Sequence, residues 1–352
     1  MRFLIKNGRV WDGEKFFFAD VVTEDGVVSK IVENFSGTAD FVYDAAGKIV
    51  SAGLVDIHAH FQGVSEDSIG ISAEMSCLPF GVTAACDAGA ALGDEKYLQG
   101  LLVKNAVFPV ARILEDKLDE ISTEARIARY GHKVAGIKLY LDAGSKNIDT
   151  GAPLRQVCDF AQKRGLKVCV HINGTPISMA EAVEILRPGD ILTHAFHGGK
   201  NTAAEDGYAC LKKAKEKGIV VDAGFAGTVH TDLQIFYDAV AAGVYPDTLS
   251  TDITCFSAFR RGGRYGMTMC MNLARDAGMP EEEIFRSVTT AAAKAVGMPW
   301  GRLYEGGAAD LAVFAVTDEG FDLTDEAGNH RKSAEGYRCV LTILDGKLVY
   351  RY

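Results

Sequence analysis

Six side chains of the kinds that bind metal ions or transfer protons lie at or near the ends of short apolar segments. His58 and His60 are two residues apart, and on a β-strand such a pair points to the same side. Imidazole nitrogens and carboxylate oxygens suit zinc and its first-row relatives, with an open position left for water. The pattern predicts a metal centre built from His58, His60, Lys138, His171, His194 and Asp252.

A centre of this kind predicts hydrolysis of a carbonyl compound. A divalent ion lowers the pKa of its bound water toward neutrality, and two ions about 3.5–4 Å apart can share the resulting hydroxide and polarise the carbonyl under attack. A ligand that bridges two ions must be an anion. Lys138 qualifies only if its neutral amine, which burial near positive charge favours, has reacted with carbon dioxide to form a carbamate.

Each of these residues also has a structural interpretation. A single histidine after an apolar run, such as His171, is commonly a hydrogen-bonded structural group, and Asp252 can cap a helix or a turn. Lys138 is harder to explain in this way, because Ile137 and Leu139 flank it and an unpaired buried ammonium is costly.

The central part of the chain predicts the framework that brings the six together. Short apolar runs alternate with helical patterns, and eight such units in about 250 residues match a (β/α)8 barrel, in which catalytic groups gather where the strands end. An open doubly wound sheet would need a Gly-rich phosphate loop after its first strand, and the sequence has none. The predicted strands are 54–58, 82–87, 101–107, 134–141, 167–171, 190–194, 219–222 and 248–252.

The two ends of the chain predict short strands joined by tight turns. Asn-Gly and Asp-Gly pairs, such as those at 7–8, 25–26 and 345–346, separate apolar runs and are strong hairpin signals. Each end alone is too short for a stable sheet, so we expect both ends to pair. The predicted domains are a composite β-sandwich, 1–52 plus 305–352, and a barrel, 53–304.

Composition excludes several classes of protein. The 352 residues are 48% hydrophobic and 24% charged, which is typical of a globular chain. A net charge of −10 disfavours nucleic acid as a partner. No apolar run is long enough for a membrane span, and the first ten residues carry charges where a signal peptide is apolar. We therefore expect a cytoplasmic protein whose eight cysteines are buried thiols.

The segment 53–60, followed in order by Lys138, His171, His194 and Asp252, resembles the amidohydrolase superfamily, and specifically its dihydroorotase-like amidohydrolase/deacetylase branch. Segment 306–314 and the flanking β domain resemble the composite sandwich of that superfamily, so the likeness covers essentially the whole chain. Two departures are Ala52, where relatives usually carry proline, and the segment 139–142, which does not resemble the usual continuation.

The resemblance implies two divalent metal ions, with zinc as the expected metal. It implies that His58, His60 and Asp252 hold one ion, that His171 and His194 hold the other, and that carboxylated Lys138 bridges them. It further implies that Asp252 is the general base and acid, which accepts the proton of the bridging hydroxide and passes it to the leaving group. A carboxylate on the metal lies within reach of the metal's own water, which supports this double role. Members of this superfamily are commonly homo-oligomers, so the resemblance implies a homo-oligomer here as well.

Polar residues just beyond the strand ends are candidates for binding a small-molecule substrate. His197 either contacts substrate or makes a loop hydrogen bond. Three arginines within five residues are usually a solvated face, but on the catalytic rim they could clamp a substrate carboxylate. The candidate substrate-binding residues are Asn173, His197, Arg260, Arg261 and Arg264.

The expected function is metal-dependent hydrolysis of an amide or ester bond in a small acylated substrate, in the manner of a deacetylase. The nearest alternative is a cyclic amidase, of dihydroorotase or hydantoinase type, with the same metals. A purine or pyrimidine deaminase fits less well, because that branch typically works with one ion and no bridging lysine. A catalytically silent scaffold on the same fold is the non-enzyme alternative, but such relatives tend to lose ligands.

Overall fold

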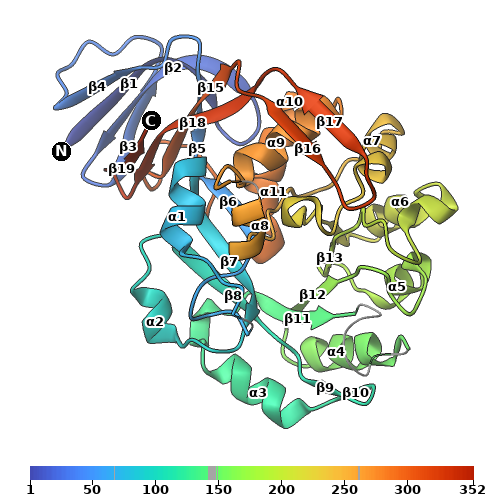
Figure 1. Cartoon of the computed structure of the whole chain (residues 1–352). Coiled ribbons are helices and arrows are strands. Elements are labelled where there is room, and N and C mark those ends of the chain that lie inside the picture. The colour runs from blue at the N-terminus through green and yellow to red at the C-terminus, as the bar shows by residue number, and fades with distance from the viewer. Residues whose placement is uncertain (67, 142–147, 149, 261) are drawn as a thin grey trace.

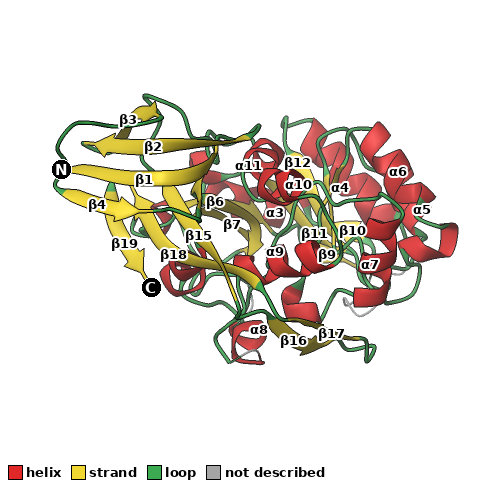
Figure 2. Cartoon of the chain, turned by 90° about the horizontal axis from the view of Figure 1, so that it is seen from above, coloured by secondary structure: helices red, strands yellow, loops and turns green. Residues whose placement is uncertain are grey.

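The computed structural model describes residues 1–66, 68–141, 148, 150–260 and 262–352 (Figure 1). Strands from both ends of the chain form one mixed sheet of eight strands, and both termini lie at this sheet (Figure 2). The junction is the antiparallel pair β5–β15. The strands are β1 (Arg2–Trp11), β2 (Phe16–Glu24), β3 (Val27–Val32), β4 (Phe41–Asp44), β5 (Ile49–Ala52), β15 (Leu311–Thr317), β18 (Gly336–Leu344) and β19 (Lys347–Arg351).

Two Asp-Gly pairs form the predicted hairpin turns. Asp25 and Gly26 between β2 and β3, and Asp345 and Gly346 between β18 and β19, all have positive φ, as the tight turn that matches strand twist requires. The Asn-Gly pair at 7–8 was wrongly expected to be a turn. It lies inside β1, where the register with β2 shifts and Asn7 N–H donates to the Asp20 carboxylate. This is a β-bulge.

Two sheets of parallel strands follow. One has three strands, β6 (Leu54–Ala59), β7 (Val82–Ala90) and β8 (Lys104–Pro109), and the other has four, β11 (Gly136–Tyr140), β12 (Lys167–His171), β13 (Ile191–Thr193) and β14 (Val220–Val221). Single parallel bridges join the two sheets. The predicted eighth strand, 248–252, is not a continuous strand, because only isolated bridges link this region to β14 and β6: Asp222↔Thr248 and Ala59↔Ile253.

Helices alternate with these strands and surround them (Figure 1). They are α1 (Ala73–Cys77), α2 (Glu95–Gln99), α3 (Glu120–Ala128), α4 (Ala152–Gln162), α5 (Met179–Ile185), α6 (Ala209–Glu216), α7 (Leu233–Ala241), α8 (Cys255–Arg260), α9 (Met267–Asp276), α10 (Glu281–Ser287) and α11 (Thr290–Val296). A 3₁₀ turn over Ala203–Asp206 precedes α6 and is separate from it, because Gly207 and Tyr208 between them both have positive φ.

Two short hairpins complete the fold. One comprises β9 (Ile113–Leu114) and β10 (Lys117–Leu118). The other comprises β16 (Phe321–Thr324) and β17 (His330–Ser333). It is inserted between β15 and β18 and contacts the start of α7. There the Asp325 carboxylate accepts a hydrogen bond from the backbone N–H of Leu233, the first residue of α7. This hairpin therefore holds the start of α7, three residues after His230.

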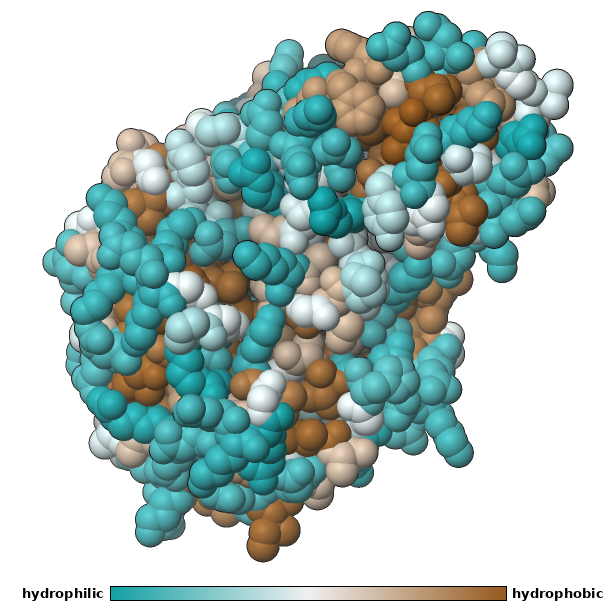
Figure 3. Space-filling view, turned by 180° about the vertical axis from the view of Figure 1, so that it is seen from behind, coloured by the Kyte–Doolittle hydropathy of each residue, from teal (hydrophilic) through white to brown (hydrophobic). Residues whose placement is uncertain are grey.

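The largest hydrophobic cluster contains residues of both the eight-stranded sheet and the parallel strands. Trp11 of β1 is fully buried and donates its indole N–H to Thr289 Oγ1 at 3.1 Å. On the face opposite to that of Figure 1, hydrophobic side chains form small groups separated by hydrophilic ones (Figure 3). Across the described ranges, no helix is both long and apolar enough to traverse a bilayer. All eight cysteines are free, and all but Cys255 are buried, as expected.

Candidate metal centre

Three predicted ligands meet at the end of β6. His58 is its fifth residue and His60 follows it, and both rings approach the carboxylate of Asp252. The distances to Asp252 Oδ1 are 3.2 Å from His58 Nε2 and 2.8 Å from His60 Nε2. All three side chains are buried. The backbone N–H of Asp252 donates to His58 O at 2.7 Å, which fixes the two segments against each other.

In each ring the Nδ1 atom faces away from Asp252. The hydrogen-bond partner of this outward Nδ1 shows which ring nitrogen carries the proton. His58 Nδ1 lies 2.9 Å from Thr193 Oγ1, and that hydroxyl donates its own proton to Asp222 at 2.6 Å. Thr193 can therefore only accept from His58, so the His58 Nδ1 atom is protonated. The Nε2 lone pair of His58 consequently faces Asp252.

His60 and His194 are held in the same way. His60 Nδ1 lies 2.9 Å from Ser65 Oγ, which donates to the Asp87 carboxylate, and His194 Nδ1 lies 2.7 Å from the Gly224 carbonyl oxygen. Their Nε2 lone pairs also point inward. Such outward hydrogen bonds to acceptors are typical of histidines that bind metal ions.

The converging atoms form a site that needs a cation. Three nitrogen lone pairs surround a carboxylate, and all of these atoms are acceptors. Within the described ranges, the buried His194 Nε2 has no hydrogen-bond partner. One ligand atom each from His58, His194 and Asp252 lies within 4.8 Å of the others. Nitrogen and oxygen donors at these positions fit a zinc-like divalent ion.

Backbone strain marks two of these positions. His194 has φ of 62° and Asp252 has φ of 47°, in the left-handed region that residues with a side chain seldom adopt. Neither is a glycine, so each conformation costs about 1–3 kcal/mol and must be held by its surroundings. Strained residues of this kind cluster at functional sites.

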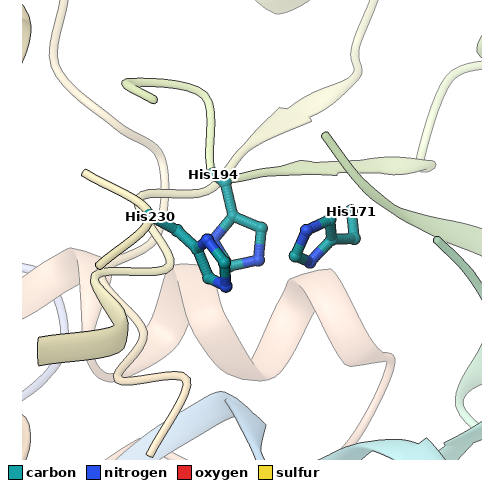
Figure 4. Close-up of side chains that lie close together, drawn as sticks. All are labelled: His171, His194 and His230. Carbon is teal, nitrogen blue, oxygen red and sulfur yellow. The ribbon is translucent and has the colours of Figure 1, made fainter. Parts of the chain in front are cut away.

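A second group of ligand-type atoms adjoins the first (Figure 4). His171 ends β12, His194 follows β13, and His230 comes from the loop between β14 and α7. Their ring centroids are 4.2–4.9 Å apart, and their ligand atoms also lie within 4.8 Å of one another. His230 was not among the predicted site residues. It lies eight residues after the predicted strand 219–222, so no strand end marks it in the sequence.

Lys138 is buried beside His58. It lies on β11 with no exposed surface, and its Nζ is 2.9 Å from His58 Nε2. The structure thus brings all six predicted ligands together.

Burial favours neutral histidine rings at this site. It lowers the pKa of His58, His171 and His194 well below the usual range, and nearby Lys138 lowers the pKa of the first two further.

A cavity of about 300 Å³ opens onto the centre. Its wall is largely apolar, and Arg260 is the only lysine or arginine among the described lining residues. Arg260 ends α8 and pairs with Glu326, which lies between β16 and β17, at 3.0 Å. The lining residues are His60, Ile69, Tyr140, His171, Ala226, Val229, His230, Asp252, Thr254, Phe256, Ser257 and Arg260.

The predicted substrate-binding residues separate into those near the cavity and those away from it. Asn173 lies beside it, with Nδ2 2.8 Å from His230 Nδ1. His197 is fully buried and is not a lining residue; its Nδ1 accepts from the N–H groups of Gly174 and Gly199, which is the loop role left open by the sequence. Arg264 does not line the cavity; it lines an adjoining groove beside Phe80, which Arg260 also lines. Arg261 lies outside the described residues.

Known proteins resemble this chain in sequence and in fold. A model of the amidohydrolase family matches residues 49–349. A deacetylase from Enterococcus faecalis is 27% identical over 373 residues, with 98% of each chain covered.

The solved structure of a dihydroorotase has a TM-score of 0.86 at 21% identity, covering 99% of this chain and 97% of its own. An adenine deaminase has a TM-score of 0.86 at 24% identity, covering 99% of both chains. These two likenesses show a shared fold. The chain belongs to the amidohydrolase family.

Proposed function

We propose that this metal-dependent hydrolase cleaves the amide or ester bond of a small open-chain acylated substrate, with deacetylation as the reaction. The observation that carries this proposal is the convergence of three Nε2 lone pairs on the Asp252 carboxylate beside the cavity. The relative named a deacetylase covers nearly the whole chain and supports the choice of reaction.

Two divalent ions, with zinc as the expected metal, would occupy this centre. His58, His60 and Asp252 would hold the first ion, His171 and His194 would hold the second, and Lys138, carboxylated on Nζ, would bridge them. When bound, these ions polarise the acyl carbonyl and supply a water of lowered pKa.

Asp252 is the residue that moves protons. Its Oδ1 faces His58 and His60, whereas Oδ2 lies 3.7 Å from His194 Nε2 and 3.9 Å from His230 Nε2. Oδ2 therefore accepts the proton of the attacking water and returns it to the leaving nitrogen or oxygen. A carboxylate placed beside the metal-bound water is within reach to accept that proton.

The cavity selects the substrate. Ile69, Val229 and Phe256 present apolar surface, and Arg260 places one cation among the lining residues. An acylated compound with an apolar body and a carboxylate would pair that carboxylate with Arg260. Phe256 is 62% exposed, so its ring is available to a substrate rather than committed to the core.

The parallel strands β6–β8 and β11–β14 would belong to a (β/α)8 barrel over 53–304. Residues 1–52 and 305–352 would form a composite β-sandwich. The parallel bridges between β8 and the β11 region and around Thr248 support a closed ring. In such a barrel the six ligand positions lie on one rim, where strands end.

A panel of substrates tests the proposed function. The purified, metal-loaded protein is assayed with N-acetyl amino acids, acetylated hydroxy acids, dihydroorotate and hydantoins. We expect hydrolysis of open-chain acetyl compounds and little turnover of the rings. Preferential opening of dihydroorotate or a hydantoin would identify a cyclic amidase and contradict the proposal.

A further inference from the structure

We propose that His230 is a catalytic residue that donates a hydrogen bond from Nε2–H to the acyl oxygen of the substrate as negative charge develops there. The inference rests on the proposed function and adds to it a residue outside the six-member ligand set. His230 forms or breaks no bond in this role, and its proton stays on Nε2 throughout.

The partner of its outward nitrogen separates His230 from the ligand histidines. The outward Nδ1 atoms of His58, His60 and His194 all face oxygen acceptors, so those rings turn a lone pair inward. His230 Nδ1 instead faces the amide nitrogen of Asn173 at 2.8 Å. An amide N–H donates to that atom, which makes Nδ1 the unprotonated nitrogen and puts the proton on Nε2.

The position of Nε2 suits a donor to substrate. It lies 3.9 Å from Asp252 Oδ2, which is too long for a direct hydrogen bond but allows both groups to contact the same reacting centre. His230 lines the cavity, and its side chain is 26% exposed, whereas that of His194 is fully buried. His171 also lines the cavity but is only 5% exposed, so His230 is the most exposed histidine of the group in Figure 4.

The ring is held in place before substrate arrives. It packs edge-on against His171 with centroids 4.9 Å apart and tilts against His194 at 4.7 Å. The following residues are also fixed, because Asp232 caps α7 and accepts from Asn329 beside the β16–β17 hairpin. A donor fixed in this way stabilises a developing oxyanion without reorganising, and removing one such donor typically lowers kcat by about 10²–10³-fold.

The alternative is that His230 is a third nitrogen ligand of the second ion, since its ligand atom lies near those of His171 and His194. The two roles differ in metal content. Removal of an oxyanion donor leaves both ions in place, whereas removal of a ligand weakens one of them.

The test compares His230→Phe, which lacks a donor, with His230→Gln, which keeps an amide N–H. His330→Gln is the control, because His330 is an exposed histidine paired with Asp322 on the β16–β17 hairpin. Each protein is loaded with zinc, its metal content is measured by elemental analysis, and kcat and KM are measured with 4-nitrophenyl acetate and with the best acetyl substrate of the panel. A cobalt-loaded sample of each supplies a visible absorption spectrum.

We expect His230→Phe to lose about 10²–10³-fold in kcat, with KM within about threefold, two ions per chain and an unchanged cobalt spectrum. His230→Gln should recover part of kcat, and His330→Gln should match the wild type. Loss of an ion or an altered cobalt spectrum in both His230 variants would make His230 a ligand and overturn the inference. Unchanged kcat in His230→Phe would overturn it as well. A wild-type protein without bound ions would instead refute the proposed function itself.

Discussion

Lys138 Nζ lies 2.9 Å from His58 Nε2, and both side chains are buried. An ammonium at this distance donates to the same lone pair that a metal ion needs, so the cation and the ion compete for His58. Reaction of the amine with carbon dioxide removes the competing positive charge and turns Lys138 into an anionic ligand. The contact therefore supports the proposed carboxylation of Lys138.

Recovery of turnover from the metal-free protein should depend on carbon dioxide. We expect apoprotein given zinc in bicarbonate buffer to regain substantially more turnover, at a given time, than apoprotein given zinc in buffer stripped of carbon dioxide. Lys138→Met should remain inactive in both buffers. Equal recovery with and without bicarbonate would contradict a carbamate at Lys138.

Replacement of Asp252 by asparagine tests the proton transfer. The amide cannot accept a proton at Oδ2, so kcat should fall by about 10²–10⁴-fold while the far-ultraviolet circular dichroism stays native. The hydrogen bond from the backbone N–H of residue 252 to His58 O does not involve the side chain and should hold the loop in place. Turnover within threefold of wild type would mean that Asp252 is not the general base.

The hydrogen-bond chain behind His60 should control the affinity of the first ion. Ser65 accepts from His60 Nδ1 and donates to Asp87, so Ser65→Ala leaves the ring without its partner. Loss of such an outer partner typically weakens metal binding by about 10–100-fold. Competition with a chromophoric chelator measures this change. Ser333→Ala, in the exposed part of the β16–β17 hairpin, is the control, and an unchanged affinity in Ser65→Ala would contradict the role of Ser65.

Two nearby arginines should behave differently toward an anionic substrate. Arg260 lines both the cavity and the adjoining groove beside Phe80, whereas Arg264 lines the groove and not the cavity. Arg260→Met should raise KM for a carboxylate-bearing acyl substrate by about three- to tenfold, which is at most about 1.4 kcal/mol, and should not change KM for a neutral one. Arg264→Met serves as the matched control and should leave both KM values unchanged. A larger rise in KM for Arg264→Met than for Arg260→Met would place the substrate carboxylate in the groove and contradict its pairing with Arg260.

His197 should make stability depend on pH. Burial, and secondarily His230, lowers the pKa of His197 to about 4, against about 6.5 in the unfolded chain. The unfolded state therefore binds more protons between these values, and the stability that His197 contributes is complete above pH 6.5 and is lost as the pH falls toward 4. That loss is at most about 3 kcal/mol.

Urea unfolding of the wild type and His197→Gln between pH 7.5 and 4 measures this effect. The wild type should be the more stable protein at pH 7.5, because glutamine lacks the ring nitrogen that accepts from Gly174 and Gly199. The difference between the two free energies of unfolding should shrink as the pH falls. A constant difference across this range would show that His197 does not titrate as its burial implies.

Residues at strand ends could be located from the sequence, because an apolar run fixes both the strand and its end. This reasoning located His58, His171 and His194, which the structure brings together around Asp252. Lys138 lies inside β11 rather than at its end, and it was singled out by its apolar neighbours Ile137 and Leu139. His230 follows no strand end, and only the folded loop before α7 carries it to the cavity. The different surroundings of Arg260 and Arg264 could not be predicted either, because the intervening turn at Gly262 and Gly263, both at positive φ, redirects the chain.

Local patterns were less reliable where tertiary contacts decide the outcome. The Asn-Gly pair at Asn7 lies within a strand, because the Asp20 carboxylate accepts its N–H and stabilises a bulge. The segment ending at Asp252 was expected to be a strand, yet it makes single bridges, and the left-handed φ of Asp252 ends any regular pairing there. In both cases a carboxylate contact or a strained functional position overrides the local pattern.

The metal content of the native protein tests the central claim most directly. Elemental analysis of protein purified without chelators should find two zinc-like divalent ions per chain, and replacement of His58 and His60 together by alanine should remove at least one of them. Wild-type protein that contains no stoichiometric zinc, manganese, nickel, cobalt or iron, and takes up none when it is offered, would contradict the account.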